Sequence, residues 1–201
     1  DRIMEESELL IKKRLEGLLS ASEKDYIMER AIFAGGCFWC TEAYFIEIDG
    51  VDDLNPGYIG GNVDNPTYEM ICTGNTGHVE AIEIIYDSTK VSYLNLLEVF
   101  FDTHDPTQVD GQGNDIGSQY MSAIYYTNDR QKQDAANYIE KIFSNYTNPI
   151  ITKLYSEKPF FIAEDYHKNY FKNNRGQPYC QIVIEPKYNG FISKYNSLLK
   201  K

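Results

Sequence analysis

The sequence has few features other than a hydrophobic core that could stabilise a fold. Four cysteines in 201 residues are too few for a disulfide scaffold. Basic residues number 19 against 30 acidic ones, and the net charge of −11 argues against nucleic acid as a partner, because phosphate binding needs clustered lysine and arginine. No apolar run approaches the roughly 20 residues that span a bilayer, and no segment is typical of a signal peptide. We therefore expect a cytoplasmic protein that binds neither nucleic acid nor membrane.

Histidine is also rare, with three copies scattered along the chain. Neither His104 nor His167 has cysteines at the spacing that is typical of zinc sites. We therefore expect no metal and no bound cofactor.

What is present suffices for one domain with an N-terminal extension. Hydrophobic residues make up 42% and charged residues 24% of the chain, which is ordinary for a globular protein. Residues 1–29 are highly charged, and Ile11, Leu15 and Leu18 follow one helical stripe. The pattern predicts a helical extension over 1–29, packed on the domain or on a neighbour, and a single domain over 30–201.

Short strands and helices alternate along this domain. Hydrophobic patterning and turn residues predict strands over 31–34, 51–59, 78–87 and 121–127. Helices are predicted over 38–47, 92–104 and 130–146. The order β-α-β-β-α-β is that of ferredoxin-like folds, so we expect an α+β protein with a two-layer α/β sandwich and a C-terminal extension.

Less regular segments surround this core. A further strand is predicted over 150–156 and a short helix over 164–171. Two loops, 60–77 and 105–119, are rich in Gly, Asn, Asp and Pro. Loops of this length are uncommon in compact domains and are often functional.

Cys37 is the first candidate for chemistry. Two glycines precede it at the end of a predicted strand, and a helix is predicted to begin beside it. Free N–H groups and the helix dipole at such a position favour a thiolate. Phe38 and Trp39 follow directly and would form an apolar surface suited to a methyl or thioether group.

Glu80 is the second candidate. Alternation along strand 78–87 places it on the same face as Ile82 and Ile84. Burial disfavours the charged form of a carboxyl group and raises its pKa. A neutral Glu80 could donate a proton near neutral pH.

Several segments together resemble the A-type peptide methionine sulfoxide reductase family. The run Gly-Cys-Phe-Trp at 36–39 looks like the signature of that family, and the other segments follow in the family's order over about residues 31–186. The matching segments are 35–39, 57–61, 65–69, 76–80, 105–107, 112–120, 164–167 and 178–180.

The resemblance implies thiol-dependent reduction of methionine-S-sulfoxide, free or in proteins, and so the repair of oxidised proteins. Cys37 would be the nucleophile, becoming a sulfenic acid and then part of a disulfide. Phe38 and Trp39 would cradle the methyl group of the substrate.

The resemblance also implies a polar side to the site. Tyr68, Tyr120 and Glu80 would surround the sulfoxide oxygen, with Glu80 as the proton donor. Asp115 would take part in a network that lowers the pKa of the Cys37 thiol. Both long loops would then supply site residues.

The sequence departs from the family at Cys40 and in the C-terminal tail. Many members have glycine at position 40 and a glycine-rich tail that carries recycling cysteines. Cys180 matches the usual resolving position, and 181–184 could be a strand that holds it. Cys40 is the rival, and direct reduction of Cys37 by an external thiol is a third route. A thioredoxin-like reductant would restore the thiols, and Cys72 is expected to serve packing.

Two other functions stay open on the residues alone. The pair Cys37 and Cys40 would also suit a general dithiol-disulfide oxidoreductase. A non-catalytic module could instead recognise methionine-containing segments through Phe38 and Trp39.

Overall fold

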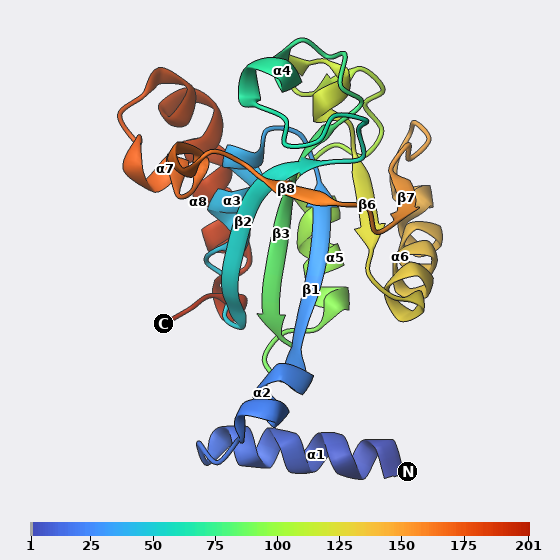
Figure 1. Cartoon of the computed structure of the whole chain (residues 1–201), viewed down its shortest axis with the longest axis vertical. Coiled ribbons are helices and arrows are strands. Elements are labelled where there is room, and N and C mark those ends of the chain that lie inside the picture. The colour runs from blue at the N-terminus through green and yellow to red at the C-terminus, as the bar shows by residue number, and fades with distance from the viewer. Residues whose placement is uncertain (1) are drawn as a thin grey trace.

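A six-stranded sheet runs through the centre of the molecule, with the strand order β7-β6-β1-β3-β2-β8 (Figure 1). The computed structural model describes residues 2–201, without the side chains of residues 2, 3, 25 and 26. Neighbouring strands are antiparallel except for β6 and β7, which are parallel. The strands are β1 (Met28–Ala34), β2 (Val51–Ile59), β3 (Val79–Asp87), β6 (Ala123–Tyr126), β7 (Lys153–Ser156) and β8 (Phe160–Ile162).

Helices lie around this sheet (Figure 1). The α-helices are α1 (Arg2–Leu15), α2 (Ala21–Ile27), α3 (Phe38–Phe45), α4 (Tyr68–Cys72), α5 (Tyr93–Asp102), α6 (Asp129–Ile142), α7 (Tyr170–Asn173) and α8 (Glu185–Lys194). Short 3₁₀ turns are η1 (Ser118–Tyr120), η2 (Phe143–Asn145), η3 (Asp165–His167) and η5 (Asn196–Leu198), and η4 (Cys180–Ile184) is π-helical. None of the described helices is long and apolar enough to cross a membrane.

The α+β class is confirmed, and β1, α3, β2, β3, α5 and β6 occur in the predicted order, with short elements inserted in the two long loops. The sheet has two edge strands beyond the four of the predicted core. One of them, β7, lies within the predicted segment 150–156. The other, β8, was missed because a three-residue strand is too short to show a period in sequence.

The core follows from side-chain alternation in the strands. On β1, Phe33 faces one side of the sheet and Ile32 the other, and each belongs to a different buried cluster. The larger cluster lies between the sheet and the helices α3 and α5, where Phe33 stacks on Phe100 with ring centroids 4.8 Å apart. Glu80 of β3 lies on the same face as Ile82, as alternation predicted.

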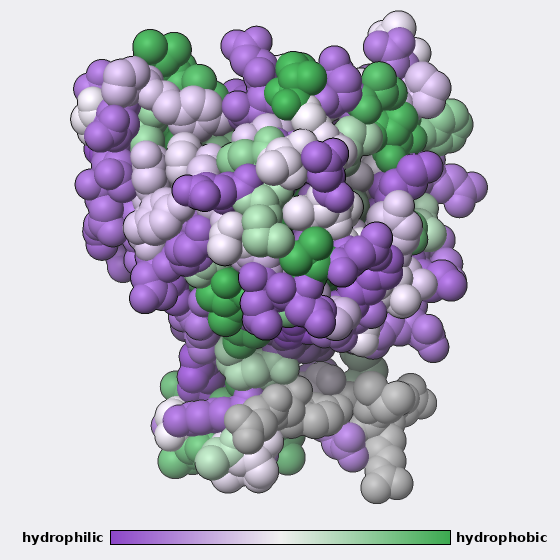
Figure 2. Space-filling model, turned by 45° about the horizontal axis from the view of Figure 1, so that its top comes forward, coloured by the Kyte–Doolittle hydropathy of each residue, from purple (hydrophilic) through white to green (hydrophobic). Residues whose placement is uncertain are grey.

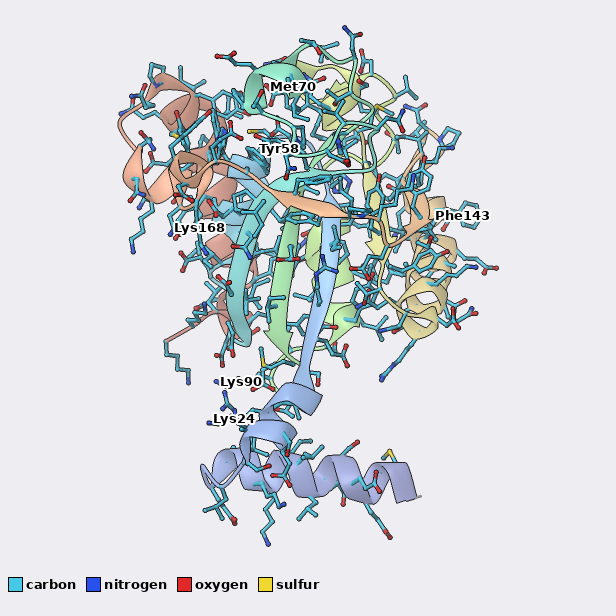
Figure 3. All side chains as sticks on the ribbon, in the orientation of Figure 1. Lys24, Tyr58, Met70, Lys90, Phe143 and Lys168 are labelled. Atoms are coloured by element: carbon cyan, nitrogen blue, oxygen red, sulfur yellow. The ribbon has the colours of Figure 1, made fainter. Side chains whose placement is uncertain are left out.

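Both long loops contain short structure that the sequence analysis did not predict. The loop 60–77 carries α4, which Thr67 caps by accepting the N–H of Met70. Figure 3 shows Met70 above the end of β2 that carries Tyr58. The loop 105–119 carries a hairpin of β4 (Gly111–Gln112) and β5 (Asp115–Ile116).

The C-terminal segment corrects one expectation. Residues 181–184 do not form a strand but continue as π-helix η4 into α8. β-Branched residues favoured a strand, but Cys180 and Ile184 lie four apart and are both fully buried, which is helical spacing. Pro186 then occupies the first turn of α8, where proline is tolerated.

The N-terminal extension is helical, as predicted, but it forms two helices and buries little. Gly17 follows α1 with a φ of +69°, and the N–H of Leu18 returns to the carbonyl of Lys13 at 2.8 Å, which ends the helix. Leu15 and Leu18 are exposed, and α1 lies below the sheet (Figure 1). Polar residues cover most of the face of the main body seen in Figure 2.

Candidate active site

Cys37 lies where β1 turns into α3. Gly36 makes this turn with a φ of +95°, a conformation that glycine adopts without strain. Cys37 is the N-cap residue of α3, and its carbonyl accepts the N–H of Cys40 at 3.1 Å. Both cysteines are buried, 8% exposed each. The predicted position of Cys37 at a helix N-terminus is therefore confirmed.

The two thiols differ in acidity, and Cys37 is less acidic than its place at a helix N-terminus suggested. Burial raises the pKa of Cys37 well above its usual value, and the hydrogen bond with Cys40 and the nearby charge of Glu80 raise it further. The hydrogen bond from Cys37 lowers the pKa of Cys40, and Lys187 adds to this. Cys40 is therefore the more acidic of the two thiols, because desolvation of Cys37 outweighs the helix terminus.

Asp115 reaches the thiols through a tyrosine. Its Oδ2 accepts the hydroxyl proton of Tyr179 at 2.6 Å, and that hydroxyl lies 3.9 Å from the Sγ of Cys40. The charge of Asp115 raises the pKa of Cys40. Asp115 therefore lies in a polar network beside the thiols, and its charge disfavours ionisation of Cys40, because like charges repel.

Glu80 is buried beside the same helix. It is 1% exposed, and its Oε1 accepts the main-chain N–H of Phe38 at 3.1 Å. Burial raises the pKa of Glu80 to about 8, with smaller contributions from Asp115 and Cys40, while the Phe38 N–H opposes the shift. The protonated form of Glu80 is therefore favoured at neutral pH.

Trp39 forms one wall of the site with aromatic neighbours. Its indole stacks on Tyr170, with centroids 3.8 Å apart and planes 8° from parallel, and Tyr179 meets it edge-on. The indole N–H donates to Nδ1 of His167 at 2.9 Å. Phe38 differs from Trp39, because it is fully buried and packs in the core beneath the site.

Tyr68 and Tyr120 are half-buried, and the charge of Glu80 acts on both. Burial raises the pKa of both hydroxyls, so both stay protonated and can donate. Glu164 anchors Tyr68 by accepting its main-chain N–H at 3.0 Å, and also accepts the hydroxyl proton of Tyr58 at 3.0 Å. The structure thus brings Glu80, Tyr68 and Tyr120 together as predicted.

Comparison with known proteins identifies the family. The family model for peptide methionine sulfoxide reductase matches residues 29–198. The chain belongs to this family. The relative named peptide methionine sulfoxide reductase MsrA from Acinetobacter baumannii (strain SDF) is 47% identical over 173 residues, which are 86% of this chain and 99% of the relative. The one from Deinococcus radiodurans is 47% identical over 174 residues, covering 86% of this chain and 84% of the relative.

Solved structures of the family have the same fold. Methionine sulfoxide reductase A of Corynebacterium diphtheriae superposes with a TM-score of 0.66 at 33% identity, covering 74% of this chain and 76% of that one. Reduced Mxr1 from Saccharomyces cerevisiae gives a TM-score of 0.73 at 29% identity, covering 77% and 90%. The match begins at residue 29, so α1 and α2 precede the matched residues.

The other two cysteines occupy different surroundings. Cys180 is fully buried at the start of η4, whereas Cys72 is exposed at the end of α4. Cys72 hydrogen-bonds to Tyr68, so it lies beside the site. The sequence predicted a packing residue instead. A cavity of about 340 Å³ reaches Cys37 and Cys40 and is also lined by Tyr179, Asp115 and Lys187.

Sequence reasoning gave no role to several residues that complete the site. His167, Tyr170 and Tyr179 hold Trp39, and Glu164 holds Tyr68. All four are far from Cys37 in the sequence. Glu164, His167 and Tyr179 lie in segments 164–167 and 178–180, and the resemblance of these segments to the family was the only signal that pointed to them. Among the described residues, no group of three or more His, Cys, Asp or Glu side chains could hold a metal ion.

Proposed function

We propose that this chain reduces methionine-S-sulfoxide, free or in proteins, to methionine, with Cys37 as the nucleophile. One observation carries the proposal: a thiol at the N-terminus of α3 lies beside a buried Glu80 whose pKa of about 8 keeps it protonated at pH 7. Membership of the peptide methionine sulfoxide reductase family supports the same reaction. Repair of oxidised proteins would be its consequence.

A protonated carboxyl group is what the first step of the reaction requires. A sulfoxide sulfur is a poor electrophile until its oxygen is protonated or strongly hydrogen-bonded. Glu80 would give its proton to that oxygen, and the hydroxyls of Tyr68 and Tyr120 would donate hydrogen bonds as negative charge develops there. Trp39 would contact the methyl group.

The sulfur chemistry balances as two thiol steps. Cys37 attacks the sulfoxide sulfur, the sulfur–oxygen bond breaks, and the oxygen passes to Cys37 as a sulfenic acid while methionine leaves. A second thiol then attacks this sulfenic acid, forming a disulfide and releasing water. A dithiol reductant finally returns both cysteines to thiols and becomes a disulfide itself.

Substrate binding would have to free the Cys37 thiolate. In the resting structure burial and the hydrogen bond with Cys40 raise the pKa of Cys37, and an ionised Glu80 would raise it further. With Glu80 protonated at pH 7, its charge does not oppose ionisation of Cys37. A proton passed from Cys37 to Cys40 would then leave the attacking sulfur charged.

Cys40 is the resolving thiol that the geometry supports. The sequence favoured Cys180, which matches the usual position. Cys40 already shares a hydrogen bond with Cys37, both line the same cavity, and one helical turn suits the Cα separation of a disulfide. Cys180 is fully buried in η4 and would act in a second exchange, after η4 moves.

The reductant would be an external dithiol protein of the thioredoxin type, and no bound cofactor is required. All four cysteines are free thiols in the structure. A reducing compartment keeps such thiols available, so we propose the cytoplasm as the place of action.

The test is incubation with both methionine sulfoxide epimers and dithiothreitol. The proposal requires loss of the S epimer alone, and no turnover by Cys37→Ser. Loss of both epimers, or turnover by that variant, would contradict it. A general dithiol-disulfide oxidoreductase would instead reduce protein disulfides and leave both sulfoxides intact.

A further inference from the structure

Glu42 is a buried carboxyl group that the proposed chemistry does not use. It lies on α3, one helical turn beyond Trp39, and is 2% exposed. Its Oε1 accepts the main-chain N–H of Tyr170 at 3.3 Å. Within residues 2–201, its Oε2 is buried and has no hydrogen-bond partner. An unpaired oxygen of this kind is costly, and more so when it is charged.

The segment that Glu42 holds is also the segment that holds Trp39. Tyr170 stacks on the indole, and three residues earlier His167 accepts the indole N–H. Between them, Asn169 has a left-handed backbone with φ +56°, and its N–H also bonds to Glu42. The carboxyl of Glu42 therefore ties α3 to the chain that covers it.

We propose that Glu42 is a positioning residue for Trp39, acting through residues 167–170. By binding the main-chain N–H of Tyr170, it fixes the two side chains that keep the indole against the site. It touches neither substrate nor the reacting sulfur. A role of Glu42 in substrate binding rests on the proposed function. The contact of Glu42 with residues 167–170, which we call the clamp, does not.

The clamp should depend on pH, because its anchor is ionisable. Burial raises the pKa of Glu42 to about 7, while the N–H groups of Asn169 and Tyr170 and the charge of Lys168 oppose the shift. If residues 167–170 lift away, water reaches the carboxyl and its pKa returns toward the ordinary 4.5. Protonation therefore favours the closed clamp, and opening becomes more favourable as the pH rises from about 4.5 to about 7, above which both forms are ionised.

Other charged groups near α3 act elsewhere. Lys168, labelled beside β2 in Figure 3, is the cation that acts on Glu42, and it is held by Asp53 of β2 at 3.0 Å. From β3 and α8, Glu80 and Lys187 act on Cys37 and Cys40 respectively. On the covering segment, His167 faces Trp39, and burial lowers its pKa below the usual 6.5.

Hydrogen exchange of the Tyr170 amide measures the clamp directly. With a closed-state pKa of about 7 and an open-state value near 4.5, protection corrected for the intrinsic rate should fall about tenfold between pH 6 and pH 8.5. Glu42→Gln keeps a neutral acceptor, so its protection should not change over this range. Glu42→Leu removes the acceptor and should give low protection at both pH values.

Trp39 supplies a second measurement, because it is the one tryptophan in the chain. The fluorescence emission of Trp39 should change as the pH passes through 7 in the unaltered protein and in Glu80→Gln. It should stay constant in Glu42→Gln. KM for the sulfoxide should rise with pH in the unaltered protein but not in Glu42→Gln, with similar kcat values, because the indole binds ground state and transition state alike.

Several results would overturn the proposal. Tyr170 protection that falls equally in Glu42→Gln and the unaltered protein would place the titration elsewhere, and protection that stays level in both would remove the clamp. A merely structural Glu42 would lower stability in Glu42→Leu without changing the Tyr170 profile. Glu80→Gln separates this test from the proposed function, since it should abolish rapid reduction and keep the tenfold change.

Discussion

The Oε1 atom of Glu80 accepts a hydrogen bond from the main-chain N–H of Phe38 at 3.1 Å. This bond joins β3 to the first turn of α3, the helix that Cys37 caps. Two effects on the carboxyl oppose each other there. The N–H favours the ionised form, burial favours the neutral form, and the resulting pKa of about 8 shows that burial dominates.

Glu80→Gln should lower kcat by about 10²- to 10³-fold at pH 7, because the amide cannot supply the proton. KM should change little, since glutamine has the same size and can still accept the Phe38 N–H. Steady-state kinetics on methionine-S-sulfoxide measure both constants. As pH rises above about 8, Glu80 ionises, so the ratio of unaltered to variant rate should fall toward 1. A constant ratio from pH 6 to pH 10 would remove Glu80 from the acid role.

The same substitution should stabilise the protein at high pH. The pKa of Glu80 is raised from 4.5 to about 8 in the folded state, so folding carries no penalty from this group below pH 4.5 and a growing one up to pH 8. Relative to the unaltered protein, Glu80→Gln should gain on the order of 4 kcal/mol in unfolding free energy between pH 4.5 and pH 8. Denaturant unfolding at both values checks this.

A matched control separates this effect from the loss of one negative charge. Glu98 is an exposed carboxylate on α5, and Glu98→Gln should run parallel to the unaltered protein across the pH range. If Glu80→Gln also runs parallel, the carboxyl is not desolvated in solution.

The part of the site nearest the nucleophile could be predicted from sequence because its signals are local. Two glycines, a cysteine and a helix start stand together, so Cys37 at the N-cap followed from turn chemistry. The face of Glu80 followed from a period of two along one strand. The βαββαβ order followed in the same way, from periods that single segments display.

The missed features depend on contacts between distant segments. No local pattern indicates that Glu164 accepts the N–H of Tyr68, or that Tyr170 stacks on Trp39 across 131 residues. The raised pKa of Cys37 was not predicted from sequence, because desolvation depends on the whole fold and exceeded the effect of the local helix terminus. The helical tail at 180–194 was missed because β-branched residues favour strands until burial decides.

Cys40→Ser should keep the first turnover and slow the later ones. Cys37 can still attack the sulfoxide, so about one methionine per chain should appear without reductant. The sulfenic acid would then persist, because its neighbouring thiol is absent. Quench-flow measurement of methionine, with mass mapping of alkylated cysteines, follows both steps.

Cys180→Ser is the matched comparison for Cys40→Ser. We expect it to form a disulfide between Cys37 and Cys40 after the first turnover. A disulfide between Cys37 and Cys180 in the unaltered protein, formed equally fast in Cys40→Ser, would return the resolving role to Cys180.

Gly36→Ala should damage the turn that presents Cys37. Gly36 has φ +95°, and an added Cβ would lie 2.6 Å from Cβ of Gln112, whose amide is bonded to both main-chain groups of Asp105. Backbone strain alone costs about 1–3 kcal/mol, and displacing Gln112 adds to it.

Gly113→Ala is the control, because Gly113 also has a positive φ of +58° but nothing lies within 4 Å of the added Cβ. Thermal or denaturant unfolding should show a larger loss for Gly36→Ala, together with lower kcat, because the loop 105–119 packs directly over the turn. Equal losses in the two variants would mean that the contact with Gln112 does not constrain the nucleophile.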